Sequence, residues 1–376
     1  MVDEDGRTLL KIPISSAAIQ EQLTSLSLSY WNSLALKIIL HFGLLDNVGS
    51  GLSNAAVSSR SHWTTTDPTF HKVLMNVCEE MGLVEMISGA SEYSITSKGL
   101  AIFEDNNLRE RLQYWLQDRY LKAWLPTLAS SPISANDPVD TFKDLADNKV
   151  LLALSQRVLA EYTKQDWSGI AETLHLRDSD SIVVDLAGGA SACLLRELEK
   201  SKLRQYICME LPEVVTLSCP AVDSTVQFVA GDLFEGPLPQ GDVYLLSRVL
   251  HDWSDSKAMT ILKRVAASSP SHATVKVIDR VAQNNRQHAM LSLHMYLLQR
   301  AHERSLTEWE DLFSKGGWKL TGTQNFNDHH VFSLEKEVLS IDEVNSPSLT
   351  VPSMTSSSVN TGTSLVNKAV VPIAGT

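Results

Sequence analysis

The spacing of apolar residues changes near residue 181. Before it, apolar positions recur at the three- and four-residue spacing of amphipathic helices. After it, short apolar runs alternate with helical segments, and the runs read IVVDL, QYICME, VQFVAGD, DVYLLSRV and TVKVIDRV. This alternation predicts an α/β fold with a doubly wound, mostly parallel sheet and helices on both faces. A last strand is expected at HVFSLEKE, near residue 330.

The N-terminal pattern predicts a small helical unit. Apolar residues at helical spacing over 17–48 indicate an amphipathic helix that ends near Gly43. Asp67 and Pro68 are typical of a helix N-cap and first position, and Gly82 is typical of a helix end. The segment SEYSITSKG then alternates like a strand. Helix, helix and short hairpin in that order predict a winged-helix fold.

Composition divides the chain into four segments. The middle helical segment carries aromatic residues that either pack in a core or line a pocket for an aromatic substrate. Beyond about residue 340 the chain is mostly Ser, Thr, Val, Asn and Pro without periodicity, which indicates disorder. The expected boundaries are 1–104 for the winged-helix-like domain, 105–180 for the helical pocket region, 181–338 for a Rossmann-like catalytic domain and 339–376 for the disordered tail.

Charge and cysteine usage restrict the partners. The formal net charge is -12, and no helix is rich in Lys and Arg, which argues against nucleic-acid binding. The first residues lack the apolar core of a signal peptide, and no apolar run reaches membrane-spanning length. The four cysteines lack ligand spacing, so we expect reduced thiols in a cytoplasmic protein and no metal site.

The loop DLAGGAS, which follows the first strand, is the expected cofactor site. Ligands of open α/β sheets bind beyond the carboxyl ends of the strands. Glu210 ends the second strand, where its carboxylate can accept hydrogen bonds from ribose hydroxyls. Asp232 and Leu233 end the third strand, where an acid and an apolar side chain suit adenine. The cofactor candidates in these three loops are Asp185, Ala187, Gly188, Gly189, Glu210, Leu211, Asp232 and Leu233.

The loop sequence also indicates the class of cofactor. A dinucleotide requires a GxGxxG turn for its pyrophosphate, and a P-loop nucleotide requires GxxxxGK[ST], but the chain has neither. A cofactor with ribose and adenine but no phosphate fits better. The expected cofactor is therefore S-adenosylmethionine.

The most specific segment, SRVLHDWSDSKAMTILKRV, closely matches the LHDW-x-D segment of class I, plant- and fungal-type small-molecule O-methyltransferases. KIILHFGLLDNV and HERSLTEWEDLFSKGGW also match patterns of this family, so the chain resembles the caffeate-type family and its fungal secondary-metabolism branch over roughly residues 20–335. The family's loop is D-x-G-G-G-x-G, and Ala187 and Ser191 replace two of its glycines. A residue other than glycine destabilises such a loop by about 1–2 kcal/mol, but only where its φ is positive.

The resemblance implies methylation of a phenolic or enolic hydroxyl on a secondary metabolite such as a polyketide. It assigns His251 as the general base, with Asp279 and Glu303 as the acids around it. His251 also follows the fourth strand at the cofactor edge, and histidine titrates near neutrality, which suits a base. Ser247 stands where plant members have a lysine near the cofactor, and it joins the cofactor candidates with Arg248.

The resemblance further implies a homodimer formed through the N-terminal helical domain. The acceptor pocket is expected between helices near 110–165 and 290–300, although each of its candidate residues could equally pack in a core. These acceptor candidates are Trp124, Tyr162, Trp253, His294, Met295 and Leu298.

Two other functions are compatible with the sequence. A methyltransferase-like enzyme can catalyse dehydration or pericyclic rearrangement while the sulfonium charge acts only electrostatically. The glycine-poor loop, Ser247 and Arg280 favour this alternative. The other alternative is a non-catalytic dimeric homologue, against which the complete set of His251 and two acids argues.

Overall fold

The computed structural model describes residues 16–45, 68–87, 93–129, 141–199, 204–218, 225–282 and 289–337. The chain divides into two compact units, Met1–Glu337 and Val338–Thr376, and every described residue belongs to the first. The predicted disordered tail lies outside the described residues, as do Asp67 and Cys219.

A seven-stranded sheet forms the centre of the described chain, in the order β5-β4-β3-β6-β7-β9-β8. The first five strands pair in parallel, and the last two are antiparallel. This confirms the doubly wound, mostly parallel sheet. The strands are β3 (Ile182–Leu186), β4 (Gln205–Glu210), β5 (Val226–Ala230), β6 (Val243–Ser247), β7 (Thr274–Asp279), β8 (Trp318–Phe326) and β9 (His329–Lys336).

The sequence did not predict strand β8. Most of its residues are polar and exposed, so the apolar alternation that marks a half-buried strand is absent. It lies at the sheet edge and, within the described ranges, pairs with β9 alone, with an irregularity between Leu320 and Gly322. Only this pairing makes the segment a strand.

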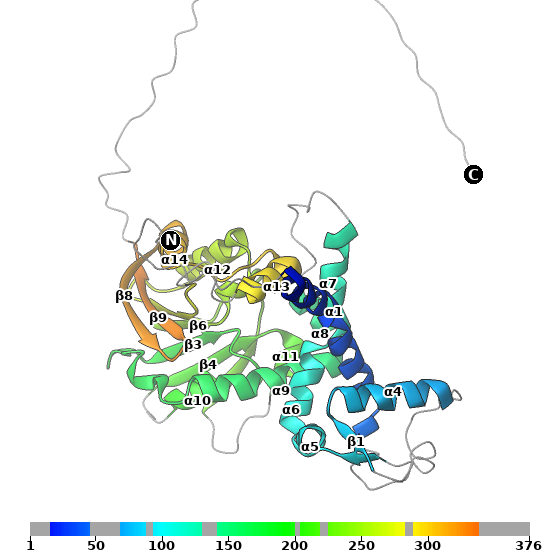
Figure 1. Cartoon of the computed structure of the whole chain (residues 1–376). Helices are drawn as coiled ribbons and strands as arrows, with labels where there is room; N and C mark the ends of the chain where they lie inside the picture. The colour runs from blue at the N-terminus through cyan, green and yellow to red at the C-terminus, as the bar shows by residue number, and fades with distance from the viewer. Residues whose placement is uncertain are drawn as a thin grey trace, which may run out of the picture. The chain divides into compact units, whose positions relative to one another are not determined.

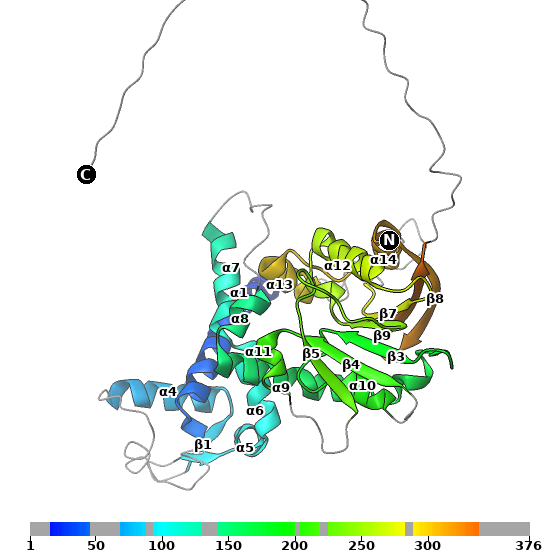
Figure 2. The same ribbon diagram turned by 180° about the vertical axis from the view of Figure 1, so that it is seen from behind.

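The sheet buries both of its faces under helices, as Figures 1 and 2 show. Neighbouring residues of β3 point to opposite faces: Val183 packs with Leu195, whereas Val184 packs in the cluster that contains Leu262 and Phe313. The strands are therefore continuously apolar, as the sequence shows. The helices after the strands are α10 (Cys193–Leu198), α11 (Pro212–Val215), α12 (Asp255–Ser268) and α14 (Leu306–Lys315), and 3-10 helices lie at η1 (Ile170–Glu172) and η2 (Leu250–Asp252).

The N-terminal elements follow the predicted order of helix, helix and hairpin. Gly82, at φ +67°, follows the end of the second helix, as expected. The elements are α1 (Ser16–His41), α4 (Pro68–Glu80), β1 (Val84–Met86), β2 (Tyr93–Ile95), α5 (Ser97–Glu104) and α6 (Asn106–Trp115). Assignment of this unit to the winged-helix class stays a prediction.

Four further helices stand beside the carboxyl edge of the sheet. Asn148 caps α9 by accepting a hydrogen bond from the Leu151 amide, and α9 contacts α6, α8, α10 and α11. Helix α13 packs against α7. Their bounds are α7 (Asp118–Ala129), α8 (Thr141–Ala146), α9 (Lys149–Asp166) and α13 (Ala289–Gln299). None of the helices in the described ranges is both long and apolar enough to span a membrane.

Candidate active site

A cavity of about 610 Å³ lies at the carboxyl ends of β3, β4 and β6 and is walled by α7, α9 and α13. The sheet order reverses between β3 and β6, so this is the topological switch point where α/β folds bind ligands. All ten residues expected to bind the cofactor line the cavity: Asp185, Ala187, Gly188, Gly189, Glu210, Leu211, Asp232, Leu233, Ser247 and Arg248.

The loop after β3 adopts the conformation that a glycine would favour at its first substituted position. Ala187 has φ +62° and Gly189 has φ +77°, whereas Ser191 is not in the left-handed region. A Cβ on Gly188 would clash with the Asp185 carboxylate, so that position favours glycine. Of the two substitutions, Ala187 therefore carries the backbone strain.

Replacing Ala187 by glycine is expected to tighten cofactor binding or to stabilise the fold. Relief of about 1 kcal/mol corresponds to a roughly fivefold lower Kd where the strain is released on binding. Where the strain is released on folding, the gain in stability is partly offset by the greater freedom of an unfolded glycine. Calorimetric titration with S-adenosylhomocysteine and thermal unfolding would measure both effects. Ser191→Gly is the control and should change neither, and a weaker-binding, less stable Ala187→Gly protein would contradict the strain.

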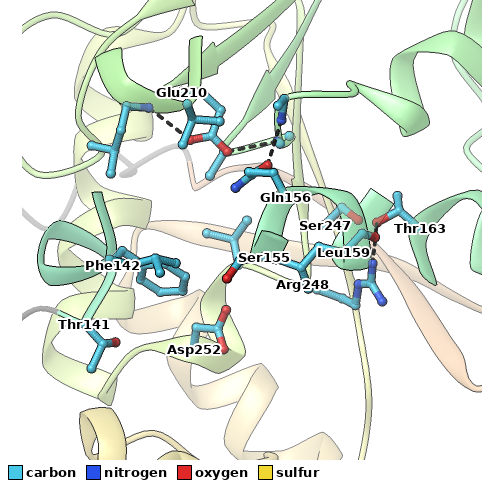
Figure 3. Close-up of a pocket in the computed structure, with 18 of the residues that line it drawn as sticks. Thr141, Phe142, Ser155, Gln156, Leu159, Thr163, Glu210, Ser247, Arg248 and Asp252 are labelled. Atoms are coloured by element: carbon cyan, nitrogen blue, oxygen red, sulfur yellow. Dashed lines mark hydrogen bonds between the residues drawn. The ribbon is translucent and has the colours of Figure 1, made fainter. Parts of the chain in front are cut away.

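Glu210 fixes the loop from the neighbouring strand. Its Oε1 accepts a hydrogen bond from the Gly189 amide at 2.9 Å, and its Oε2 accepts one from the Leu211 amide at 3.0 Å (Figure 3). Burial raises the pKa of Glu210, and these two amides oppose that shift. Each carboxylate oxygen can accept a second hydrogen bond, so the group can still receive ribose hydroxyls.

Asp185 is a buried acid that faces the cavity without a protein partner among the described residues. Both of its carboxylate oxygens are buried and unbonded. Burial, and then the charge of Glu210, raise its pKa to about 8. An unpaired buried carboxyl is costly unless a ligand supplies a donor or a cation. A cofactor with an ammonium group and a sulfonium centre meets that requirement.

Helix α9 contributes groups that the sequence analysis did not single out. Gln156 Oε1 accepts a hydrogen bond from the Ala190 amide at 2.9 Å, so the helix holds the glycine loop, which is the loop DLAGGAS after β3. Ser155 is fully buried, its hydroxyl has no partner among the described residues, and Figure 3 shows it directed into the cavity near Asp252. Neither residue belongs to a motif, so only the packing of α9 on the loop reveals them.

Asp232 is already engaged by protein groups. Its Oδ2 lies 2.9 Å from Lys143 Nζ, and its Oδ1 accepts a hydrogen bond from the Phe234 amide at 2.8 Å. Lys143 comes from α8, far away in sequence. This ion pair ties α8 to the loop after β5.

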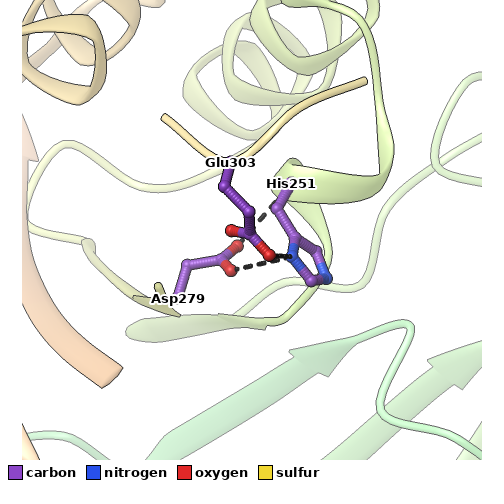
Figure 4. A group of neighbouring side chains, drawn as sticks. All are labelled: His251, Asp279 and Glu303. Atoms are coloured by element: carbon purple, nitrogen blue, oxygen red, sulfur yellow. Dashed lines mark hydrogen bonds and ion pairs between the residues drawn. The ribbon is translucent and has the colours of Figure 1, made fainter. Parts of the chain in front are cut away.

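His251 lines the cavity, and two buried acids lie together on the Nδ1 side of its ring (Figure 4). Its Nδ1 is 3.3 Å from Asp279 Oδ1 and 3.3 Å from Glu303 Oε1. Asp279 also accepts a hydrogen bond from the His251 amide at 3.3 Å, so the shorter acid still reaches the imidazole. On the other side, Nε2 is 3.7 Å from Asp252, which lines the cavity. The acids thus orient the ring and leave Nε2 toward the ligand space.

The surrounding charges set the proton affinity of this histidine. Burial alone would lower its pKa, but the carboxylates of Asp279, Asp252 and Glu303 outweigh burial and raise the pKa to about 9. Burial raises the pKa of Asp279 to about 6, with the Glu303 charge acting in the same direction and the His251 charge opposing it. The three ligand atoms also lie within 4.8 Å of one another, so the absence of a metal site stays a prediction.

The predicted acceptor residues separate into two groups. Tyr162, Trp253, His294, Met295 and Leu298 line the cavity. Trp124 is not among the lining residues and instead donates a hydrogen bond to His294 Nδ1 at 3.1 Å. An aromatic wall of the cavity is formed by three residues that the sequence placed only among the aromatic residues of the middle helical segment: Tyr114, Trp115 and Tyr120.

These features define a cofactor-dependent enzyme of the α/β type with a histidine beside the cofactor crevice. Residues 147–319 match a family model described as an O-methyltransferase domain. The chain is 26% identical to acetylserotonin O-methyltransferase of Rattus norvegicus, and the aligned region covers 79% of this chain and 72% of that enzyme. It is 27% identical to the O-methyltransferase SfmM3 of Streptomyces lavendulae, covering 77% of this chain and 92% of that one.

Solved structures show the same fold. The O-methyltransferase NcsB1 from neocarzinostatin biosynthesis, bound to S-adenosyl-L-homocysteine and 1,4-dihydroxy-2-naphthoic acid, superposes with a TM-score of 0.69 at 23% identity. The match covers 81% of this chain and 95% of NcsB1. Residues 147–319 thus form an O-methyltransferase domain, and the enzyme is an O-methyltransferase with S-adenosylmethionine as its cofactor.

Proposed function

We propose that this enzyme methylates a phenolic or enolic hydroxyl of an aromatic small molecule, with His251 as the general base. The observation that carries the proposal is the position of His251, which lines the cavity while two buried carboxylates hold its Nδ1. The cofactor, when bound, supplies an activated methyl on a positively charged sulfur. The chain must then align the acceptor and remove its proton at Nε2.

The residues expected to bind the cofactor would contact different parts of it. Asp185 and Glu210 would receive the donors of the cofactor, and Asp232 with Leu233 would contact its adenine. Glu210 and Gln156 hold the loop after β3 in place by accepting hydrogen bonds from its amides. The dihydroxynaphthoic acid bound by NcsB1 and the aromatic wall of this cavity support an aromatic acceptor.

Methyl transfer is tested with S-adenosylmethionine labelled in its methyl group and a panel of phenols. The proposal expects label in the product and one S-adenosylhomocysteine for each methyl transferred. Converted substrate without label would instead support dehydration or rearrangement. Cofactor binding without any turnover across the panel would support a non-catalytic homologue.

The pH dependence of the rate follows from the raised pKa of His251. At pH 7 a base with a pKa of about 9 is mostly protonated and inactive, so kcat should rise with pH by up to about tenfold per unit and level near pH 9. Removing one negative charge in Asp279→Asn should lower the pKa of His251 and move the midpoint to lower pH. A profile unchanged in Asp279→Asn would contradict the assignment.

We further propose that the N-terminal segment, residues 1–104, forms a homodimer. Ile19, Leu23, Leu26 and Tyr30 recur along one side of α1, and all four are exposed, Leu26 by 70%. A monomer rarely leaves such an apolar stripe in water. The helical segment, residues 105–180, would then serve the pocket of its own catalytic domain, residues 181–338.

The stripe predicts the effect of charge on assembly. Leu23→Glu combined with Leu26→Glu should convert a dimer into a monomer in light scattering coupled to gel filtration, because buried carboxylates oppose association. Ser25→Glu, which lies off the stripe, is the control and should remain dimeric. A monomeric wild-type protein would refute the interface.

A further inference from the structure

Among the described residues, two arginines of the cavity have no carboxylate partner, and one of them, Arg119, lies on the acceptor side. Arg119 is the second residue of α7 and lines the cavity beside aromatic rings. Its guanidinium stacks over Tyr120 at 4.8 Å from the ring centroid. Tyr120 in turn packs against His294, with ring centroids 4.9 Å apart. Arg119 thus belongs to the aromatic wall and not to the glycine loop.

The hydrogen bonds of Arg119 leave most of its donors available. Nη2 donates to the Tyr120 hydroxyl at 3.0 Å, and Nη1 donates to the Thr141 carbonyl at 3.3 Å. A guanidinium has five N–H donors, so three remain, and Nε is buried without a partner among the described residues. No carboxylate pairs with Arg119 in the described part of the chain, whereas Lys143 and Arg248 pair with Asp232 and Asp166.

The charge of Arg119 reaches the catalytic end of the cavity. It favours the ionised form of Asp252, the residue next to His251, although burial dominates and raises the pKa of that acid overall. It also lowers the pKa of His294, after burial, and the ring of His294 packs against Tyr120. An acceptor that lies between these groups would therefore be exposed to an unpaired positive charge.

We propose that the acceptor carries a carboxylate in addition to the hydroxyl that is methylated, and that Arg119 binds this carboxylate. The planar fork of a guanidinium matches a carboxylate, and the aromatic wall matches the ring that bears it. This rests on the proposed function, because it names the acceptor of that same site. The contact between Arg119 and the carboxylate makes the enzyme selective for aromatic hydroxy acids over neutral phenols.

Arg280 is the other arginine of the cavity without a carboxylate partner in the described ranges. Its Nε is also buried and unbonded. Its charge lowers the pKa values of Arg248 and His329, in each case after burial, so it lies on the side of β7 and not beside the aromatic wall. It is the structural alternative to Arg119 as the carboxylate-binding residue.

The test is equilibrium binding of hydroxybenzoates and hydroxynaphthoates and of their matched methyl esters, by calorimetry with S-adenosylhomocysteine present. The wild type should bind at least one acid about tenfold or more tightly than its ester. Arg119→Gln should bind that acid and its ester equally, with the Kd of the ester within about threefold of wild type. Arg119→Lys should retain part of the preference, since it keeps the charge but loses the fork.

Controls separate local from general effects. Arg157→Gln, whose arginine pairs with Glu110 away from the cavity, should keep the wild-type preference. Absence of an acid preference in the wild type, its persistence in Arg119→Gln, or its loss only in Arg280→Gln would overturn the proposal. An Arg119-dependent preference without labelled methyl transfer would refute methylation of these acids and leave the carboxylate site standing.

Discussion

Replacing His251 by alanine is expected to lower kcat by two to four orders of magnitude, the contribution typical of a positioned general base. The acceptor would then have to lose its proton to water. Asp279 and Glu303 cannot replace His251 as the base, because they lie on the Nδ1 side of the ring and do not line the cavity. The binding of S-adenosylhomocysteine should change little, because Glu210, Gln156 and the loop amides are untouched.

Steady-state kinetics with a methyl-accepting phenol, together with calorimetric titration, would measure this separation. His272→Ala is a matched control, since His272 pairs with Asp242 at 2.8 Å on the surface, outside the cavity. It should retain full activity. A His251→Ala enzyme with more than about a tenth of the wild-type kcat would exclude His251 as the base.

Replacing Arg304 by methionine is expected to destabilise the protein by about 3–5 kcal/mol, because two backbone carbonyls lose a buried donor at a cost of about 1–3 kcal/mol each. Arg304 is fully buried and donates to the carbonyls of Leu250 and Trp253, each at 2.8 Å, and to Asp255 at 2.9 Å. The two carbonyls flank His251, so the arginine also holds the segment that carries the base. Methionine supplies volume but no donors.

Thermal unfolding should show a midpoint lower by about 4–7 °C, given an unfolding entropy of about 2.1 cal/mol/K per residue over the compact unit. Arg157→Met removes an arginine that is 57% exposed at its side chain, and it should cost less than about 1 kcal/mol. Equal midpoints for Arg304→Met and wild type would show that the carbonyls find other donors. Reduced activity at temperatures where the variant stays folded would confirm the positioning effect.

The sequence predicted the sheet because buried parallel strands need apolar side chains on both faces. Val183 and Val184 illustrate this, since they pack into different cores. The same signal failed for β8, where polar edge residues hide the strand. Periodicity records burial, so an element that buries little leaves no pattern.

The cofactor loops were also predictable, because residues at the carboxyl ends of β3, β4 and β5 must meet at one edge. The strain at Ala187 was not, since the sequence left the sign of φ open and only the loop geometry gives +62°. Ser155, Gln156 and Arg119 escaped prediction because they belong to helices that fold against the sheet from far away in sequence.

The sequence by itself determined the parallel sheet, the class of cofactor and the histidine after β6, because these depend on local order along the chain. Only the tertiary structure decided how Asp279 and Glu303 converge on one nitrogen of His251 and raise its pKa to about 9. Only it placed Arg119 without a carboxylate partner, among the described residues, beside the aromatic wall. Electrostatic energies depend on the distances between charges and on their burial, and neither can be read from the order of the residues.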